Sequence, residues 1–163
     1  MIKSADDQAI ARLDRYRNAA GGSPTAEIRL EMQRTMQSDC AVFRTTETLR
    51  EGMGKIDAVN ARLQDVGIAD RSLIWNTDLI ETLEFDNLIS QSAVTVQGAL
   101  AREESRGAHA REDFPKRDDV NWMKHTLSWA DDATHEVTLD FRPVHSFTLS
   151  NEIAYIQPKE RVY

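Results

Sequence analysis

Hydrophobic residues recur at helical spacing over most of the first hundred residues. One seam follows steps of 4, 3, 3, 4 and 3 residues, the spacing of a helix in a bundle or coiled coil; it contains Leu49, Met53, Ile56, Val59, Leu63 and Val66. A second stripe contains Phe85, Ile89, Ala93, Val96 and Leu100, with Ile80, Leu83 and Leu88 beside it. A stripe this wide predicts a helix buried against two neighbours. Two shorter stripes are Ile10, Leu13 and Tyr16, and Ile28, Met32 and Met36.

Capping residues set the expected limits of the helices. The predicted starts are Ala5, Pro24 or Thr25, Thr45 or Thr46, and Asn76 or Thr77. The first helix is expected to end near Ala19, before a Gly-Gly-Ser-Pro turn, and the last near Ser105. Gly67 is expected to take a left-handed conformation after the third helix, with Ile68 folded back on Leu63.

The chain changes character after a charged loop at residues 106–119. Two segments, Trp122 to Trp129 and Thr134 to Phe141, are predicted strands because β-branched and aromatic residues alternate with polar ones. Asp131 and Asp132 suit the turn between these strands.

The predicted fold class is mainly α. We expect an antiparallel three-helix bundle, spectrin-repeat-like, with an additional N-terminal helix and a small C-terminal β-hairpin segment. Residues 1–105 would form the helical bundle. Residues 106–163 would form a loop and a small β-rich segment that packs on the bundle, within one structural domain.

Composition narrows the functional classes. The chain has 163 residues with a net charge of −7, which argues against nucleic acid as a partner. The lone Cys40 cannot form an internal disulfide, so a reducing compartment is expected. No apolar run approaches the ~20 residues of a membrane span, and the polar start does not resemble a signal peptide. Any membrane association is therefore expected to come through a partner.

Motifs for direct chemistry are weak. Gly52 and Gly54 give a bare G-x-G, but they lie inside a helix seam rather than after a strand. One cysteine cannot build a thiolate zinc site. The histidines, which form no i, i+4 pair, are interpreted as ordinary residues, with His135 and His145 at the surface; they are His109, His125, His135 and His145. Adjacent acidic residues are interpreted as solvated charge; these pairs are Asp6-Asp7, Glu103-Glu104, Asp118-Asp119 and Asp131-Asp132.

The segment from Ser105 to Pro115 is the unusual one. It gathers Arg106, His109 and Arg111 around Gly107, at the end of a long helix. Arginine offers a planar fork for carboxylates and histidine titrates near neutrality, while the glycine indicates a backbone position that a side chain would spoil. The alternative is a loop fixed to its own domain by Arg–Asp pairs.

Several separated stretches carry a resemblance to a known family. They are Ser105-Arg106-Gly107-x-His109 with Asp113 and Pro115, Arg117 to His125, Met36 to Arg44, Asn76 to Glu84, and Asn151-Glu152-Ile153 to Pro158-x-x-Arg161-Val162-Tyr163. Together they resemble the C-terminal region of the succinate dehydrogenase and fumarate reductase flavoproteins. L-aspartate oxidase is similar at the first stretch, whereas Arg117 to His125 looks most like the succinate dehydrogenase branch.

The resemblance implies a parent subunit that oxidises succinate to fumarate with covalently bound FAD. Electrons would then pass to an iron–sulfur subunit and a quinone. It implies a helical domain that packs on the flavin-binding domain of the same subunit, with no catalytic, cofactor-binding or metal residues in this chain. Such a chain alone is expected to be soluble and inactive, because the flavin carries the hydride chemistry.

The same resemblance suggests partners and a location. The expected partners are the flavin-binding domain and the iron–sulfur subunit, with Arg106, His109 and Arg111 as the candidate interface toward the flavin domain. The parent complex would lie on the cytoplasmic face of the bacterial inner membrane or the matrix face of the mitochondrial one. Alternatives are the equivalent domain of fumarate reductase or L-aspartate oxidase, or a stand-alone helical interaction module.

Overall fold

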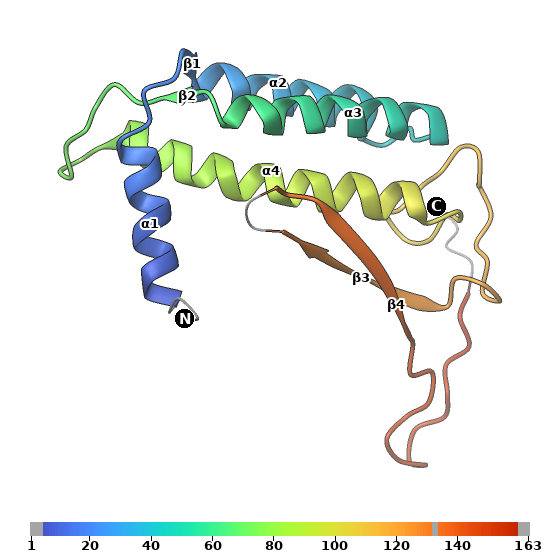
Figure 1. The fold of residues 1–163 in the computed structure, drawn as a ribbon. Coiled ribbons are helices and arrows are strands. Elements are labelled where there is room, and N and C mark those ends of the chain that lie inside the picture. Colours follow the sequence, from blue (N-terminus) through green and yellow to red (C-terminus); the bar gives the residue numbers. More distant parts are fainter. Residues whose placement is uncertain (1–4, 132–133, 160–163) are drawn as a thin grey trace.

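Three antiparallel helices form the body of the molecule. The computed structural model describes residues 5–131 and 134–159. Helices α2 (Thr25–Asp39), α3 (Thr46–Leu63) and α4 (Thr77–Ala101) lie side by side, and α1 (Ala5–Arg17) crosses the first part of α4 (Figure 1). The predicted mainly α bundle with an extra N-terminal helix is therefore confirmed.

Helix starts follow the predicted caps. Thr45 and Thr48 form a capping box, in which each side chain bonds the other residue's backbone N–H. Asn76 accepts from the Leu79 N–H at 2.8 Å, and this bond fixes the start of α4. Pro24 stands at the cap position of α2 with φ −66°, a backbone angle that proline already favours.

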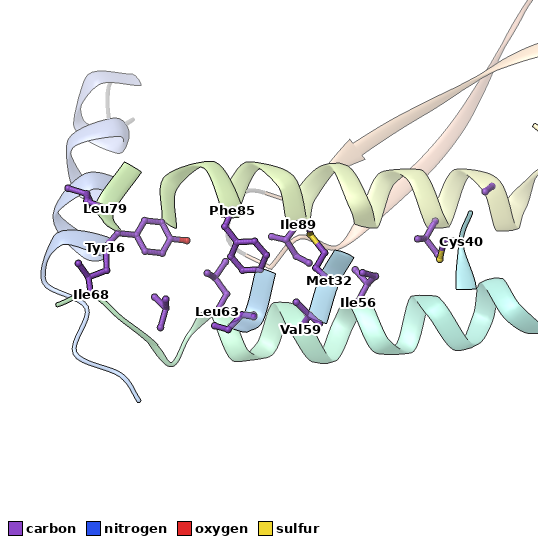
Figure 2. Close-up of a cluster of buried hydrophobic side chains, with 14 of the residues drawn as sticks. Tyr16, Met32, Cys40, Ile56, Val59, Leu63, Ile68, Leu79, Phe85 and Ile89 are labelled. Carbon is purple, nitrogen blue, oxygen red and sulfur yellow. The ribbon is translucent and has the colours of Figure 1, made fainter. Parts of the chain in front are cut away.

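The core lies between the facing sides of these helices. Figure 2 shows Phe85 and Ile89 of α4 opposite Ile56, Val59 and Leu63 of α3. Each of these side chains is almost completely buried, which stabilises the fold by roughly 1.5–3 kcal/mol per side chain. The predicted helix seams are therefore the ones that build the core.

The width of the α4 stripe was overestimated. Ile80 and Leu88 remain 55% and 37% exposed, although Leu83, Ala93 and Leu100 do pack on the core. The reason is that α1 crosses α4 at an angle and covers only part of its second side (Figure 1).

The prediction for Gly67 was wrong. Gly67 belongs to β2 (Val66–Gly67), a two-residue strand that pairs in parallel with β1 (Ser23–Pro24). Its φ is not positive, and Ile68 donates its N–H to the Ala19 carbonyl oxygen at 3.3 Å. The small residue is required because a Cβ at position 67 would lie 2.1 Å from the Gly21 oxygen.

Gly67→Ala is expected to lower the free energy of unfolding by about 2 kcal/mol, since the added methyl overpacks this crossing. The matched control is Gly54→Ala, at an exposed position of α3 where a Cβ meets no atom within 4 Å. That change should raise stability by about 0.5–1 kcal/mol through helix propensity. Urea titrations followed by circular dichroism measure both, and equal effects would contradict the packing argument.

The C-terminal segment forms the predicted β-hairpin, with its limits shifted along the chain. Strands β3 (Lys124–Ala130) and β4 (Val137–Pro143) are antiparallel, with Ala130 opposite Val137, and the hairpin lies against α4 (Figure 1). The second strand starts later than predicted because the Asp131 carboxylate accepts from both the backbone and hydroxyl of Thr134. Asp132, the other predicted turn residue, lies outside the described residues.

Candidate interface at the end of helix α4

The buried side chain of Arg111 closes the end of α4. Its Nη1 donates to the carbonyl oxygens of Ala99, Leu100 and Arg102 at 3.0, 3.1 and 3.3 Å. These carbonyls have no partner within a helix that stops at Ala101. A guanidinium here also opposes the negative end of the helix dipole. Predicting that α4 extends to Ser105 was wrong, because Arg111 ends the helix earlier.

Asp113 completes this contact and joins a second helix. Its two carboxylate oxygens each lie 2.8 Å from Arg111, one from Nε and one from Nη2. One oxygen also accepts from the backbone and hydroxyl of Thr46, at 2.7 and 2.6 Å. The hydrogen bond from Arg111 holds the pKa of Asp113 well below its usual value. The pair thus ties the C-terminal end of α4 to the N-terminal end of α3.

Glu104 is fully buried, which corrects the interpretation of the Glu103-Glu104 pair as solvated charge. Its Oε1 accepts from Arg102 at 2.5 Å and Arg106 at 2.8 Å, and its Oε2 accepts from the Asp118 backbone at 2.9 Å. Burial alone would raise the pKa of Glu104, but these hydrogen bonds lower it below its usual value. The loop folds around this carboxylate because a buried charge requires such partners.

Gly107 forms the tip of a tight turn between Arg106 and His109. The two residues exchange backbone hydrogen bonds at 2.8 and 3.0 Å. Gly107 has φ +59°, so a side chain there would be strained although no atom crowds its Cβ position. The positive φ confirms the sequence prediction that a side chain is unfavourable at this glycine.

His109 lies half-buried in a positively charged environment. Its Nδ1 is 3.3 Å from Arg44, and its Nε2 is 3.2 Å from the Arg102 carbonyl oxygen. Burial lowers the pKa of His109, and the charges of Arg44, Arg111 and Arg102 lower it further, against the effect of that carbonyl. The neutral imidazole is therefore favoured at neutral pH.

The three candidate interface residues differ in exposure: Arg111 is buried, whereas Arg106 and His109 are partly exposed. Arg111 points inward and uses its donors within the chain, as the alternative of a self-fixed loop requires. Arg106 is 28% exposed, pairs with Glu104 and Asp119, and lies at the surface with His109. Whether these residues face another domain stays a prediction.

A second buried cluster surrounds Asp86 on α4 and was not predicted from the sequence. Arg12 of α1 donates to its Oδ2 at 2.6 Å, and His135 of the hairpin turn lies 3.3 Å from its Oδ1. His135 is buried with φ +57°, so placing it at the surface was wrong, whereas His145 is indeed exposed. The cluster therefore fixes both α1 and the hairpin turn to α4.

Ser90 adds a hydroxyl to this cluster without creating a nucleophile site. Its Oγ lies 2.5 Å from His135 Nδ1 and 3.2 Å from the Asp86 carbonyl oxygen. Ser90 lies within α4, where backbone N–H groups bond along the helix and cannot stabilise an oxyanion. This Ser–His–Asp group is consequently a structural network.

The glycines do not form a cradle for a flavin phosphate. Gly52 and Gly54 lie in α3, as predicted, and a Cβ on Gly52 would lie 2.5 Å from the Cys40 sulfur. Gly52 thus serves close packing with Cys40 rather than a nucleotide. In the residues that the structure describes, no group of three or more His, Cys, Asp or Glu side chains could hold a metal ion. No helix in residues 5–131 and 134–159 is long and apolar enough to cross a membrane.

Comparison with known proteins decides the family. The model of the family described as fumarate reductase flavoprotein C-term matches residues 29–163. The chain belongs to this flavoprotein C-terminal family. The match includes most of α2 and all of α3, α4, the charged loop and the hairpin, whereas α1 lies before it.

Full-length relatives extend the likeness over the whole chain. The mitochondrial succinate dehydrogenase [ubiquinone] flavoprotein subunit of Oryza sativa is 55% identical over 99% of this chain and 25% of its own length. The succinate dehydrogenase flavoprotein subunit of Rickettsia conorii is 54% identical over 96% of this chain and 26% of its own length. The chain therefore spans about a quarter of these flavoprotein subunits.

A solved structure shows the same fold in this family. A subunit of E. coli quinol fumarate reductase superposes with a TM-score of 0.80 and 36% sequence identity. The match covers 91% of this chain and 26% of that chain. Both the bundle and its family assignment are thus supported independently of sequence motifs.

Proposed function

We propose that this chain acts as the C-terminal helical domain of a succinate dehydrogenase flavoprotein subunit. The identity of 55% to the rice subunit, along 99% of the chain, carries the proposal. The lower identity of 36% to quinol fumarate reductase favours succinate dehydrogenase over that branch of the family.

In this proposal the complete subunit oxidises succinate to fumarate and uses covalently bound FAD. The flavin, held by the rest of the subunit, would supply the hydride chemistry, and an iron–sulfur subunit and a quinone would be the onward electron acceptors. The residues of this chain supply no redox group; they give the flavin-binding domain a rigid surface against which to pack. Membership of such a complex would place the chain at a membrane face through its partners.

The loop at the end of α4 is the proposed contact with the flavin-binding domain. Arg106 and His109 are partly exposed there. The buried Glu104 holds the Arg106 side chain, and the turn at Gly107 sets the backbone. Arg111 would act indirectly, by holding the loop on the ends of α3 and α4. A rigid, preorganised surface loses little entropy on docking.

A domain exchange tests the proposal. The matching quarter of the Rickettsia conorii subunit is replaced by this chain, and covalent flavin and succinate-dependent dye reduction are measured. We expect the hybrid to retain both, and this chain alone to show neither flavin absorbance nor activity. A folded hybrid without flavin, beside an active parent, would overturn the proposal.

Arg106→Ala in the hybrid tests the interface. We expect flavin incorporation to fall several-fold, because the loop loses contacts with Glu104 and with the docked domain. The control is Arg34→Gln on the exposed side of α2. Unchanged flavin incorporation in a folded Arg106→Ala hybrid would remove Arg106 from the interface and leave the domain assignment intact.

A further inference from the structure

Two adjoining pockets form one groove between α4 and the hairpin. The first, of about 500 Å³, lies at the end of α4 beside the start of β3. The second, of about 290 Å³, continues along α4 past Gly98. They share Arg102, His109 and Thr126, so we treat them as one feature, the basic groove.

The basic groove has an unusual charge for this chain. Its cationic side chains are Arg44, Arg102, Arg106 and Lys124, and none of its lining residues is acidic. The whole chain, in contrast, has 27 acidic against 20 basic residues. Such a local excess of positive charge attracts anions and orients them on approach.

Two of these cations have no carboxylate partner within the described part of the chain. Arg102 and Arg106 are already paired with Glu104, and Arg106 also with Asp119. Neither Arg44 nor Lys124 has a carboxylate within 4.0 Å among the residues that the structure describes. An anion in the groove would therefore meet two uncompensated charges.

Both unpaired cations are held in place. Lys124 Nζ lies 4.6 and 4.1 Å from the ring centres of Trp122 and Phe141, a cation–π arrangement. Arg44 Nε donates to the carbonyl oxygens of Cys40 and Ala41 at 3.0 and 2.5 Å. Side chains that are already ordered lose little entropy when they bind a ligand.

The shape of the groove favours a chain segment over a small molecule. Lys124, Thr126 and Ser128 alternate along one face of β3, so the polar lining extends along the strand. Ser128 and His125 remain exposed at the rim, whereas small ligands are usually enclosed by their sites. An extended polypeptide would fit a groove that runs along the strand and is open to solvent at its rim.

We propose that the basic groove binds an acidic polypeptide segment whose carboxylates pair with Arg44 and Lys124. This inference stands on the groove's own residues and holds whichever protein supplies the segment. Its failure would leave the domain assignment untouched, because the two are tested on different molecules.

The test uses this chain, labelled with ¹⁵N, and a hexaglutamate peptide at low salt. We expect saturable shifts of the backbone amides at 98–109 and 124–128, and their loss at high salt. Lys124→Gln should weaken binding roughly fivefold, the loss expected for one exposed ion pair. Helix α2 lies across α4 from the hairpin (Figure 1), so Arg34→Gln at an exposed position of α2 should leave binding unchanged.

Gly98→Asp provides a second variant that does not remove a structural contact. A Cβ at position 98 meets no atom within 4 Å, so the new carboxylate fits and competes for the cations. It should weaken binding by more than Lys124→Gln does, and Gly98→Ala should have no effect.

Malonate and inorganic phosphate are titrated in parallel as small anions. Both should bind more weakly than hexaglutamate, since each reaches only one part of the groove. Absence of hexaglutamate binding would overturn the proposal. Equal or tighter binding of malonate or phosphate would overturn the polypeptide assignment in favour of a small-anion site.

Discussion

Replacing Arg111 by methionine should lower the free energy of unfolding by roughly 3 kcal/mol, because buried carbonyl oxygens at the end of α4 lose a charged donor. Methionine keeps much of the volume but removes the Arg111 donor from the last carbonyls of α4 and leaves Asp113 only its bonds from Thr46. Since domains of this size are stable by only about 5–15 kcal/mol, the variant should be close to unfolding. Urea titration at neutral pH measures the change.

Arg117→Met is the matched control, because Arg117 lies in the same loop and pairs with the exposed Asp119. Its loss should be about 0–1 kcal/mol. The double variant Arg111→Met with Asp113→Leu should be more stable than the sum of the single losses predicts, since it removes both partners of the ion pair. Equal losses in Arg111→Met and Arg117→Met would refute a special role for Arg111.

Asp86→Asn should cost about 3 kcal/mol and release α1 from α4. Burial would raise the pKa of Asp86, but His135, Tyr16 and Arg12 outweigh it and hold the pKa at about 2, against an ordinary 3.8. The carboxylate thus contributes about 2 kcal/mol of stability that is present above pH 4 and is lost as the pH falls through 2.

The measurement compares the native chain and Asp86→Asn by urea titration between pH 7 and pH 2. The gap in unfolding free energy should be widest at neutral pH and shrink below pH 4. Asp14→Asn, at an exposed position of α1, should follow the native chain throughout. If the difference in unfolding free energy stays constant down to pH 2, the negative charge of Asp86 does not contribute to stability.

The helices could be predicted because their determinants are local. The seam of α3 and the caps at Thr45 and Asn76 depend on residues within a few positions of one another. The hairpin could be predicted for the same reason, since its strands alternate and adjoin in sequence. What was missed depends on partners from distant segments.

Glu104 and His135 illustrate the limit. Each is an ordinary polar residue in its local context. In the fold, Glu104 is buried with Arg106 and the Asp118 backbone as hydrogen-bond partners, and His135 is buried beside Asp86. The early end of α4 likewise depends on the later residue Arg111. The sequence identified the loop as unusual. It could not show that the Arg111 side chain points into the domain, because that depends on the ends of α3 and α4.

Because Cys40 is buried against Gly52, its reactivity measures local unfolding where α2 joins α3. The only sulfhydryl in the molecule lies under the corner between α2 and α3, where burial and the charge of Asp39 raise its pKa and keep it protonated. A protonated, covered thiol reacts slowly with disulfide reagents. The rate at which a chromogenic disulfide reagent reacts with Cys40 therefore measures how often this part of the fold opens, without a probe attached beforehand.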